Sequence, residues 1–363
     1  MKKTIFVHLY NDFSGSPRVL KEMVTALSNQ SENCIITSNS HGILSDIKNV
    51  KYKNFTYKPV NNKFLKLLLF IKANLTIFFL LCIEIIKSKI PKNDITIIVN
   101  TMLPFGALWA AKVFNVKTIA YVHETSIKPL LLKSFLKFSI KKSAVKVIYV
   151  SQYLKDQERF NNIPEVIVPN PVSQELISEG IKYQQKIADR TILFLSSLVK
   201  YKGIHDFIKI AKISSSKKDQ LNYIMVINSS HDDFNHFIAN NKIPENMIVY
   251  YRPKSIVDLY AKAAFVLNLS DPKYLVETFG LTLVEGMSNG AVPIGPIIGG
   301  PAEIIKSNSG FIIENHKHAE IQRIMFDLLN NPEKYIEFSN SALSDAKKYS
   351  LSNYEKNIRK AIF

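Results

Sequence analysis

Short apolar runs rich in β-branched residues alternate along the chain with longer segments in which apolar residues recur every three or four positions. The short runs are typical of buried strands, and the longer segments have the period of amphipathic helices. Strands are expected at residues 4–9, 34–38, 95–100, 116–122, 145–151, 165–169, 191–197, 222–228, 246–251, 264–270 and 291–295. Because strands that alternate with helices form parallel sheets covered on both faces, the pattern predicts an α/β protein.

The chain is long enough for two domains of this kind, since it has 363 residues of which 47% are hydrophobic. A polar segment with prolines, at residues 168–180, separates the first six expected strands from the other five. We therefore predict two doubly wound, Rossmann-like domains, at residues 1–170 and 171–346. The two cysteines are too few for a disulfide framework and indicate a reducing compartment. We expect the N-terminus to form a strand rather than a signal peptide.

The segment at residues 62–89 is apolar enough to raise the question of a membrane span. Lys66, Lys72 and Glu84 interrupt it, and its longest uncharged stretch, Ala73–Ile83, has eleven residues. A span needs roughly 20 apolar residues. We expect a helix packed beneath the strand at 95–100, with partial membrane contact as the alternative.

The net charge of +17 is concentrated in the first half of the chain. Residues 1–170 carry 24 lysines and arginines against 10 acids, whereas residues 171–363 carry 23 against 20. A domain this basic favours an anionic partner, such as a membrane surface, a nucleic acid or a polyanionic substrate. The basic segments have few arginines and no aromatic stacking pattern, so nucleic acid is not expected.

The segment at residues 127–142 has the pattern of a basic amphipathic helix. Lys133, Lys137 and Lys141 recur at helical spacing, with leucines and phenylalanines between them. A helix of this kind can lie at an anionic interface with its apolar face buried. We predict contact of these three lysines with an anionic membrane surface, and the alternative is an ordinary solvated face over a core stripe.

Several motifs of catalysis and metal binding are absent from the sequence. It has no GxxxxGK[ST], no GxGxxG, no HExxH, no CxxC and no Asp-x-Asp pair. We therefore expect no metal site and no cofactor.

The stretch "ETFGLTLVE", at residues 277–285, places two carboxylates around a turn and a short helix. The turn follows the strand at 264–270, and ligands of open α/β sheets bind at the carboxyl ends of strands. The backbone N–H groups of Phe279, Gly280 and Leu281 form a helix N-terminus, which favours a phosphate. Glu277 can face whatever the phosphate carries, and Glu285 can accept two ribose hydroxyls. A nucleoside diphosphate linked to a sugar satisfies all of these groups.

This stretch resembles the E-x7-E motif of retaining glycosyltransferases of the family 4 type, which have the GT-B fold. The likeness extends along the whole chain, through "NDFSGSPRVLKEMVTAL", "AYVHE", "VIYVSQYLKD", "VIVPNPV", "SSLVKYKGIHDFIKIAK" and "GGPAEII". The resemblance implies that the two domains face one another across a cleft. It also implies that a C-terminal helix, at about 347–363, packs back on the first domain.

The resemblance also implies roles for individual residues. Glu277 would bind hydroxyls of the donor sugar, Glu285 would bind the ribose, and Lys202 would neutralise the diphosphate leaving group. His123 would lie beside the donor sugar at the reacting carbon. Two further contacts would come from the backbone: Gly15 and Ser16 would contact the phosphate, and the segment around Arg252 would cover the base.

One position departs from the family pattern. The family usually has an arginine five residues before this lysine, and here that position is Ser197, which cannot supply a cation. Lys200 or Arg18 could compensate. A catalytically weak, membrane-bound subunit that binds a sugar nucleotide is therefore one alternative function, and a nucleotide-sugar epimerase on the same fold is another.

The resemblance as a whole predicts a metal-independent glycosyltransferase of the hexosyltransferase type. Its donor would be a UDP- or GDP-linked sugar, and its acceptor a lipid-linked saccharide. We expect a cytoplasmic protein, peripheral on the inner face of the cell membrane, in the synthesis of a bacterial surface polysaccharide such as O-antigen.

Overall fold

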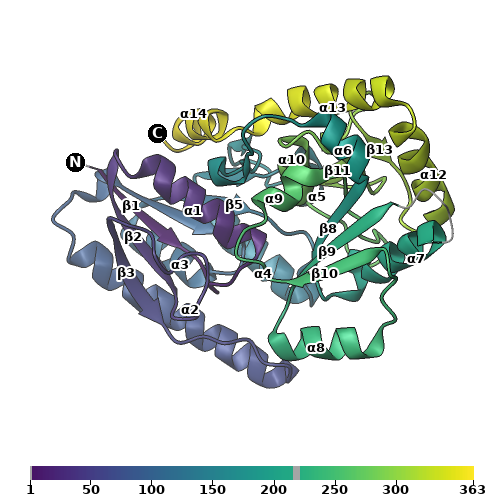
Figure 1. Cartoon of the computed structure of the whole chain (residues 1–363). Coiled ribbons are helices and arrows are strands. Elements are labelled where there is room, and N and C mark those ends of the chain that lie inside the picture. Colours follow the sequence, from purple (N-terminus) through teal and green to yellow (C-terminus); the bar gives the residue numbers. More distant parts are fainter. Residues whose placement is uncertain (1, 216–220) are drawn as a thin grey trace. The chain divides into compact units, whose positions relative to one another are not determined.

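The structure is a computed structural model that describes residues 2–215 and 221–363. The chain divides into two compact units (Figure 1). The N-terminal unit comprises Met1–Pro171 together with Ser352–Phe363, and the C-terminal unit comprises Val172–Leu351. Each unit is built around a parallel sheet of its own.

The sheet of the N-terminal unit has the strand order β3-β2-β1-β4-β5-β6-β7. Its strands are β1 (Lys2–Val7), β2 (Ser31–Ser38), β3 (Val50–Phe55), β4 (Ile95–Asn100), β5 (Lys117–Val122), β6 (Lys146–Tyr149) and β7 (Glu165–Ile167). The order reverses between β1 and β4, because the chain first adds β2 and β3 on one side and then returns. Such a switch point leaves a crevice at the carboxyl ends of its two strands, where α/β sheets bind ligands.

The helices of this unit cover both faces of the sheet. They are α1 (Gly15–Leu27), α2 (Lys63–Ile86), η1 (Lys92–Asp94), α3 (Phe105–Phe114), α4 (Leu130–Ser143), α5 (Gln152–Glu158) and α14 (Leu351–Ile362). Since parallel crossovers are right-handed, α2, α3 and α4 lie on one face and α1 lies on the other. The ring of Phe105 in α3 lies 5.6 Å from Phe70 of α2 and 5.0 Å from Phe135 of α4, so the three helices are neighbours.

The C-terminal helix α14 is bound to the N-terminal unit through its last carbonyl groups. Lys117 and Lys146 each donate a hydrogen bond of 2.5 Å, to the carbonyl oxygens of Ile362 and Ala361 respectively. Arg359 in turn donates to the carbonyl oxygen of Ala26 at 2.9 Å. Cations at a helix C-terminus satisfy carbonyls that have no partner within the helix and oppose the negative end of its dipole.

The sheet of the C-terminal unit has the order β10-β9-β8-β11-β12-β13, with its switch point between β8 and β11. Its strands are β8 (Thr191–Ser197), β9 (Asn222–Asn228), β10 (Met247–Tyr251), β11 (Ala263–Leu267), β12 (Val292–Gly295) and β13 (Phe311–Ile312). The helical segments are η2 (Gln174–Leu176), α6 (Tyr183–Asp189), η3 (Lys200–Lys202), α7 (Ile204–Ser215), α8 (His231–Asn240), α9 (Val257–Lys262), α10 (Leu281–Met287), α11 (Gly300–Ile304), α12 (His318–Leu329), α13 (Pro332–Ala346) and η4 (Lys347–Tyr349).

The α/β class and the two doubly wound sheets predicted from the sequence are confirmed. All expected strands form, with ends that differ by a few residues. Two strands were not predicted. Strand β3 (Val50–Phe55) lies at a sheet edge and carries two lysines, a composition that protects edges from pairing but hides the strand pattern. Strand β13 (Phe311–Ile312) has only two residues.

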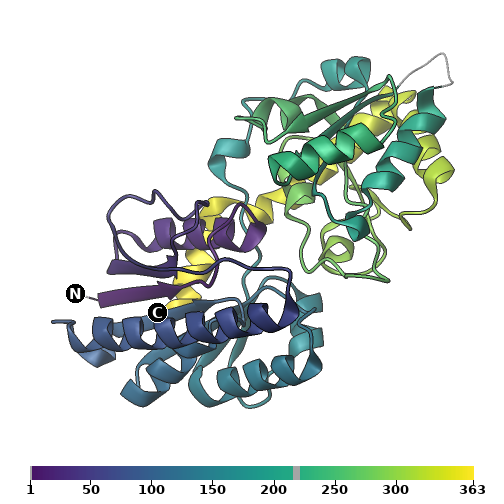
Figure 2. The same ribbon diagram turned by 90° about the horizontal axis from the view of Figure 1, so that it is seen from below.

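The segment expected to form a buried helix at residues 62–89 forms α2, but the expected packing differs. Its main neighbours are α3, β2 and β3, rather than the strand at 95–100. By length and composition α2 could cross a membrane, and only 39% of its most apolar window is buried. Figure 2 shows this long blue helix along the outside of the N-terminal unit.

Candidate functional site

In the C-terminal unit, three polar side chains meet at the carboxyl ends of β8 and β11. The Nζ of Lys202, in η3 after β8, lies 2.5 Å from the Oε2 of Glu277. Ser270, just after β11, donates its hydroxyl to the same oxygen at 3.1 Å. The Lys202 and Glu277 side chains are 24% and 21% exposed, so the pair is accessible to a ligand. The cluster therefore lies at the switch point of the sheet, where ligands bind.

The ion pair changes what the two residues do before a ligand binds. The sequence assigned Lys202 to a diphosphate and Glu277 to a sugar, and the structure pairs them with one another. Each neutralises the other, so an incoming anion has to compete with Glu277 for the ammonium group. Ser270 was missed in the sequence because a lone serine after a strand carries no distinguishing signal.

The backbone that follows Glu277 is held by two adjacent glycines, Gly299 and Gly300. Gly300 donates its N–H to the carbonyl oxygen of Glu277 at 2.9 Å. A Cβ on Gly299 would lie 2.4 Å from that oxygen, and one on Gly300 would lie 2.5 Å from the carbonyl oxygen of Thr278. Only glycine permits this approach. The "GG" of the sequence therefore fixes the loop that presents Glu277.

The turn after Glu277 leads into the seven-residue helix α10. Gly280 adopts a φ of 107° at the helix start, a conformation that favours glycine. Phe279 is buried, with its ring 5.5 Å from that of Tyr349, and Leu281 begins the helix. The turn is thus anchored by Phe279. That these backbone N–H groups bind a phosphate stays a prediction.

Glu285, inside α10, is 1% exposed. Tyr260, in α9, donates its hydroxyl to the Oε2 of Glu285 at 2.5 Å. The structure therefore brings Glu285 together with a buried tyrosine that the sequence had not singled out. In the sequence Tyr260 stands beside apolar residues and resembles an ordinary core position. The pattern therefore did not indicate that it binds Glu285.

Two other residues of this unit lie at the same edge of the sheet. Ser197 ends β8 next to Asn228, which ends β9. Arg252, directly after β10, has a positive φ of 35° and donates from its Nε to the Oδ1 of Asn228 at 2.7 Å. The structure thus holds the Arg252 guanidinium against the end of β9, at the edge where the resemblance places the base of the nucleotide.

In the N-terminal unit, Asn100 joins three groups at the switch point between β1 and β4. Its Nδ2 lies 3.0 Å from the Nδ1 of His8 and donates to the carbonyl oxygen of Ser16 at 3.1 Å. Its Oδ1 lies 2.8 Å from the Nε2 of His123. A carbonyl only accepts, so the amide nitrogen must face Ser16, and the amide oxygen must then face His123. His123 therefore donates from Nε2, and the Nδ1 of His8 accepts.

Burial determines the protonation states of the two histidines. Burial lowers the pKa of His8 to about 4 and that of His123, which also lies near His8, to about 3. Both are therefore neutral near pH 7. The sequence predicted His123 but missed Asn100 and His8, since neither lies in a recognisable motif.

Glu124, the residue after His123, is another titratable group at this edge. Its carboxylate accepts from the backbone N–H of Met102 at 2.9 Å and from that of His123 at 3.1 Å. Burial nevertheless raises the pKa of Glu124 to about 7. The glutamate thus fixes the backbone of His123 and titrates close to neutral pH.

Gly15 and Ser16 form the first turn of α1, close to the same switch point. The carbonyl oxygen of Ser16 is engaged with Asn100, so α1 is tied to the end of β4. A Cβ built on Gly15 would meet nothing within 4 Å. The fold itself therefore does not require glycine at position 15. A substitution here can test whether a ligand approaches this backbone.

Two of the three lysines assigned to a membrane surface form ion pairs with a buried acid, and their contact with a membrane stays a prediction. Lys133 and Lys137 lie 2.5 and 3.2 Å from the carboxylate oxygens of Glu158, which is 1% exposed. Residues 125–155 contain no acid, and Glu158 lies just beyond them in the sequence. Helical spacing within α4 therefore could not identify Glu158 as the partner of these lysines. Lys141 is exposed.

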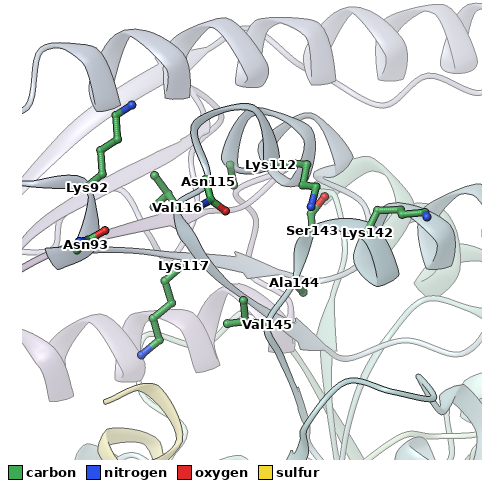
Figure 3. A pocket seen from close by; sticks show the side chains of 11 residues that line it. Lys92, Asn93, Lys112, Asn115, Val116, Lys117, Lys142, Ser143, Ala144 and Val145 are labelled. Atoms are coloured by element: carbon green, nitrogen blue, oxygen red, sulfur yellow. The ribbon is translucent and has the colours of Figure 1, made fainter.

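No metal site is evident in the part of the chain that the structure describes. Residues 2–215 and 221–363 contain no group of three histidine, cysteine or acidic side chains placed to bind a metal. A cavity of about 430 Å³ at the amino ends of β4, β5 and β6 is lined by Lys92, Lys117 and Lys142, among other residues. Figure 3 shows these three side chains pointing away from one another, so they do not form an anion site.

Comparison with known sequences finds one family model that matches part of the chain. Residues 179–345 match the family described as Glycosyl transferases group 1. An uncharacterized glycosyltransferase of Haemophilus influenzae is 21% identical over 71% of this chain and 72% of its own length. Sucrose-phosphate synthase 4 of Arabidopsis thaliana is 27% identical over 30% of this chain. The chain spans about a tenth of the length of that protein and of the bacterial sucrose synthases that it also matches.

Solved structures of low sequence identity share the fold over nearly the whole chain. HepE of Anabaena, solved in complex with UDP and glucose, has a TM-score of 0.75 and 16% identity, with 99% of both chains covered. Sucrose-phosphate synthase of Thermosynechococcus elongatus has a TM-score of 0.77 and 13% identity, with 99% of this chain and 98% of its own covered. The chain therefore has the GT-B fold, and its residues 179–345 match the model of the glycosyl transferases group 1 family.

Proposed function

We propose that the protein is a retaining, metal-independent glycosyltransferase that transfers a sugar from a nucleoside diphosphate to an acceptor hydroxyl. The cluster of Lys202, Ser270 and Glu277 carries this proposal, because it puts a cation and a hydroxyl-binding carboxylate together at the switch point of a group 1 domain. The related fold of HepE, which was solved with UDP-glucose, supports a nucleotide sugar as the donor.

In the proposed mechanism Lys202 stabilises the diphosphate as the bond to the sugar breaks. Negative charge grows on the leaving oxygen in that step, so a positioned ammonium group lowers the barrier. Glu277 binds hydroxyls of the sugar, whose ring gains positive charge in the transition state. Glu285 accepts from the ribose, and the neutral His123 lies beside the sugar. The diphosphate, on the same face as the incoming acceptor, takes the acceptor's proton, which accounts for retention.

The acceptor is proposed to be a lipid-linked saccharide of a bacterial surface polysaccharide, such as O-antigen. The concentration of positive charge in residues 1–170 supports an acceptor at an anionic membrane. We accordingly propose a cytoplasmic protein that is peripheral on the inner face of the cell membrane.

The experiment is a transfer assay on the purified chain with UDP- and GDP-linked sugars, a lipid-linked acceptor and a chelator. Release of nucleotide that depends on the acceptor, with an unchanged anomeric configuration by NMR and no effect of the chelator, is expected. Donor that isomerises without acceptor would instead identify an epimerase. An inverted product would contradict the proposed mechanism.

A second candidate function is a sugar-nucleotide-binding subunit with weak catalysis. Ser197, at the position where the family usually carries an arginine, supports it, because the diphosphate would then have one cation fewer. Tight donor binding by calorimetry without turnover, in the presence of acceptor, would favour this function over the first.

A further inference from the structure

Helix α2 has two apolar faces, of which one is firmly packed. The Oδ1 of Asn74 accepts from the backbone N–H of Gly106, at the start of α3, at 2.9 Å. Glu84, near the C-terminal end of α2, lies 2.8 Å from the Nζ of Lys3 and 2.9 Å from that of Lys51. These buried polar contacts hold the inner face of α2 against the unit from Asn74, in the middle of the helix, to Glu84.

The opposite face of α2 carries a continuous row of large apolar side chains that are solvent-exposed. We call these residues, which follow one another at intervals of three or four, the outer stripe: Phe64, Leu68, Ile71, Leu75, Phe79, Ile83 and Ile86. Each is between 41% and 72% exposed. A surface helix of a soluble protein normally presents polar residues on this side, and a large apolar patch marks an interaction site.

The charges around the outer stripe are all of one sign. The exposed charged residues of α2 are Lys63, Lys66 and Lys72, and Lys87 and Lys89 follow its last turn. The one acid of the helix, Glu84, is buried against Lys3 and Lys51. Apolar residues flanked by lysines suit the boundary between acyl chains and anionic headgroups, where the lysine stems reach outward to the phosphates.

The position of α2 in the fold places the start of the stripe at the same edge of the sheet as the candidate site of this unit. Helices α2 and α4 both follow strands, so both begin at the carboxyl edge of the sheet, where Gly15 and His123 also lie. At the start of α4, Leu130 and Leu131 are 76% and 82% exposed. The apolar starts of two helices therefore border the edge at which a lipid-linked acceptor would arrive.

We propose that the outer stripe of α2 docks this protein on an anionic phospholipid bilayer, with the helix lying in the plane of the interface. The helix is long enough to span a bilayer, but its packed inner face keeps it on the unit, so it lies on the membrane rather than across it. The proposal rests on the membrane-bound acceptor of the proposed function, and it replaces the α4 lysines as the main contact.

The first test compares vesicle binding by the full chain and a variant with Leu68→Gln, Ile71→Gln, Leu75→Gln and Phe79→Gln. Glutamine keeps helix propensity, so the fold should persist. On vesicles of phosphatidylcholine with phosphatidylglycerol we expect the partition coefficient to fall by about 100-fold or more. The matched control carries Ile238→Gln, Ile248→Gln, Tyr250→Gln and Ile312→Gln, four exposed apolar residues of the C-terminal unit, and should bind like the wild type.

The second test reports insertion directly, using the one tryptophan of the chain. In a Trp109→Phe background, Phe79→Trp should be quenched by lipids brominated on the acyl chains, and Ile248→Trp should not. Equal vesicle binding by wild type and glutamine variant, or no quenching at position 79, would overturn the proposal. So would a lipid-free dimer that the four glutamines dissociate, because the stripe would then join two copies of the chain.

The outcome can be separated from that of the proposed function. Calorimetry with a nucleoside diphosphate should give the same affinity for wild type and glutamine variant, because the stripe lies outside the donor site. A chain that docks on vesicles but binds no nucleotide sugar would refute the proposed function and leave the docking surface intact.

Discussion

At the scale of single residues, the ion pair between Lys202 and Glu277 is the feature that most shapes the proposed chemistry. The lysine is already neutralised before a donor binds, and Ser270 holds the same carboxylate oxygen. A nucleoside diphosphate therefore has to displace Glu277 from the ammonium group, after which the carboxylate is available for sugar hydroxyls. The pair couples recognition of the phosphate to recognition of the sugar.

Removing each partner of this pair should affect nucleotide binding in opposite directions. Glu277→Gln should strengthen binding of the bare nucleoside diphosphate several-fold, because Lys202 no longer has a competing anion, and should reduce turnover. Lys202→Ala should weaken binding by about 1.5–3 kcal/mol, the value of a charged hydrogen bond. Calorimetry on both variants checks this, with Lys209→Ala, at an exposed lysine of α7, as the matched control. Equal losses of affinity for Glu277→Gln and Lys202→Ala would contradict it.

The group around Asn100 predicts how stability depends on pH. Between about pH 6.5 and 4.5, His8 and His123 take up protons only in the unfolded chain, whereas Glu124 is protonated only in the folded one. The unfolded state thus binds one more proton from this group. The contribution of this group to stability is therefore greatest near pH 6.5, and it falls by about 1.4 kcal/mol per pH unit as the pH drops through this window. Above pH 6.5 it also decreases, because folded Glu124 then loses its proton.

His123→Asn should remove one of these protons and with it the slope from this group. Denaturant unfolding of wild type and variant at several pH values between 4.5 and 6.5 measures the difference, in which other carboxylates cancel. Parallel curves for the two proteins would show that His123 is protonated in the folded state and would refute its proposed neutral form.

At the scale of elements, α4 shows that helical spacing alone does not reveal the partner of a lysine. The period that brings Lys133 and Lys137 to one side of a helix is the same for a membrane contact and for an ion pair with a buried acid. In the structure both lysines pair with Glu158, in α5.

Changing Lys133 and Lys137 together to Met should lower the free energy of unfolding by roughly 3–5 kcal/mol, because a buried carboxylate loses its partners.

The matched control for α4 is Lys141→Met, at an exposed position on the same helix. It should change the free energy of unfolding by less than about 0.5 kcal/mol. Chemical denaturation of the two variants measures both effects. Similar stability losses in the two would mean that Glu158 does not depend on the pair.

The start of α1 offers a substitution that separates ligand binding from folding. Gly15→Ala meets no atom within 4 Å, and alanine favours a helix, so thermal stability should stay the same or rise slightly. If a phosphate approaches the backbone here, the added methyl group should weaken nucleotide binding by about 10-fold. Unchanged affinity in calorimetry would remove Gly15 from the donor site.

The sequence predicted elements more successfully than side-chain contacts. Short apolar runs were enough to predict eleven strands, because a buried parallel strand is apolar along its own sequence whatever it packs against. Contacts between residues distant in sequence leave none. Asn100 with His8 and His123, and Tyr260 with Glu285, depend on which strand ends meet. The exposed apolar face of α2 could not be predicted for the same reason. The sequence of an apolar helix does not show whether other elements cover it.

At the scale of the whole molecule, two doubly wound units each carry a candidate site at their own switch point. The C-terminal unit brings Lys202, Ser270 and Glu277 together, and the N-terminal unit joins Asn100 to His8, Ser16 and His123. We propose that the C-terminal unit provides most of the nucleotide contacts and that the N-terminal unit binds the acceptor and the membrane. Variants of the first should therefore change nucleotide affinity, and variants of the outer stripe should change membrane binding alone.

The measurement that tests the central claim most directly is sugar transfer by the purified wild-type chain, compared with its Glu277→Gln variant, on anionic vesicles that carry the acceptor. The account predicts nucleotide release that requires both a UDP- or GDP-linked sugar and the acceptor, and a loss of about 10- to 150-fold in the variant, the equivalent of one charged hydrogen bond in the transition state. Nucleotide release by the wild type that is the same without acceptor, or an unaltered rate in the variant, would contradict it.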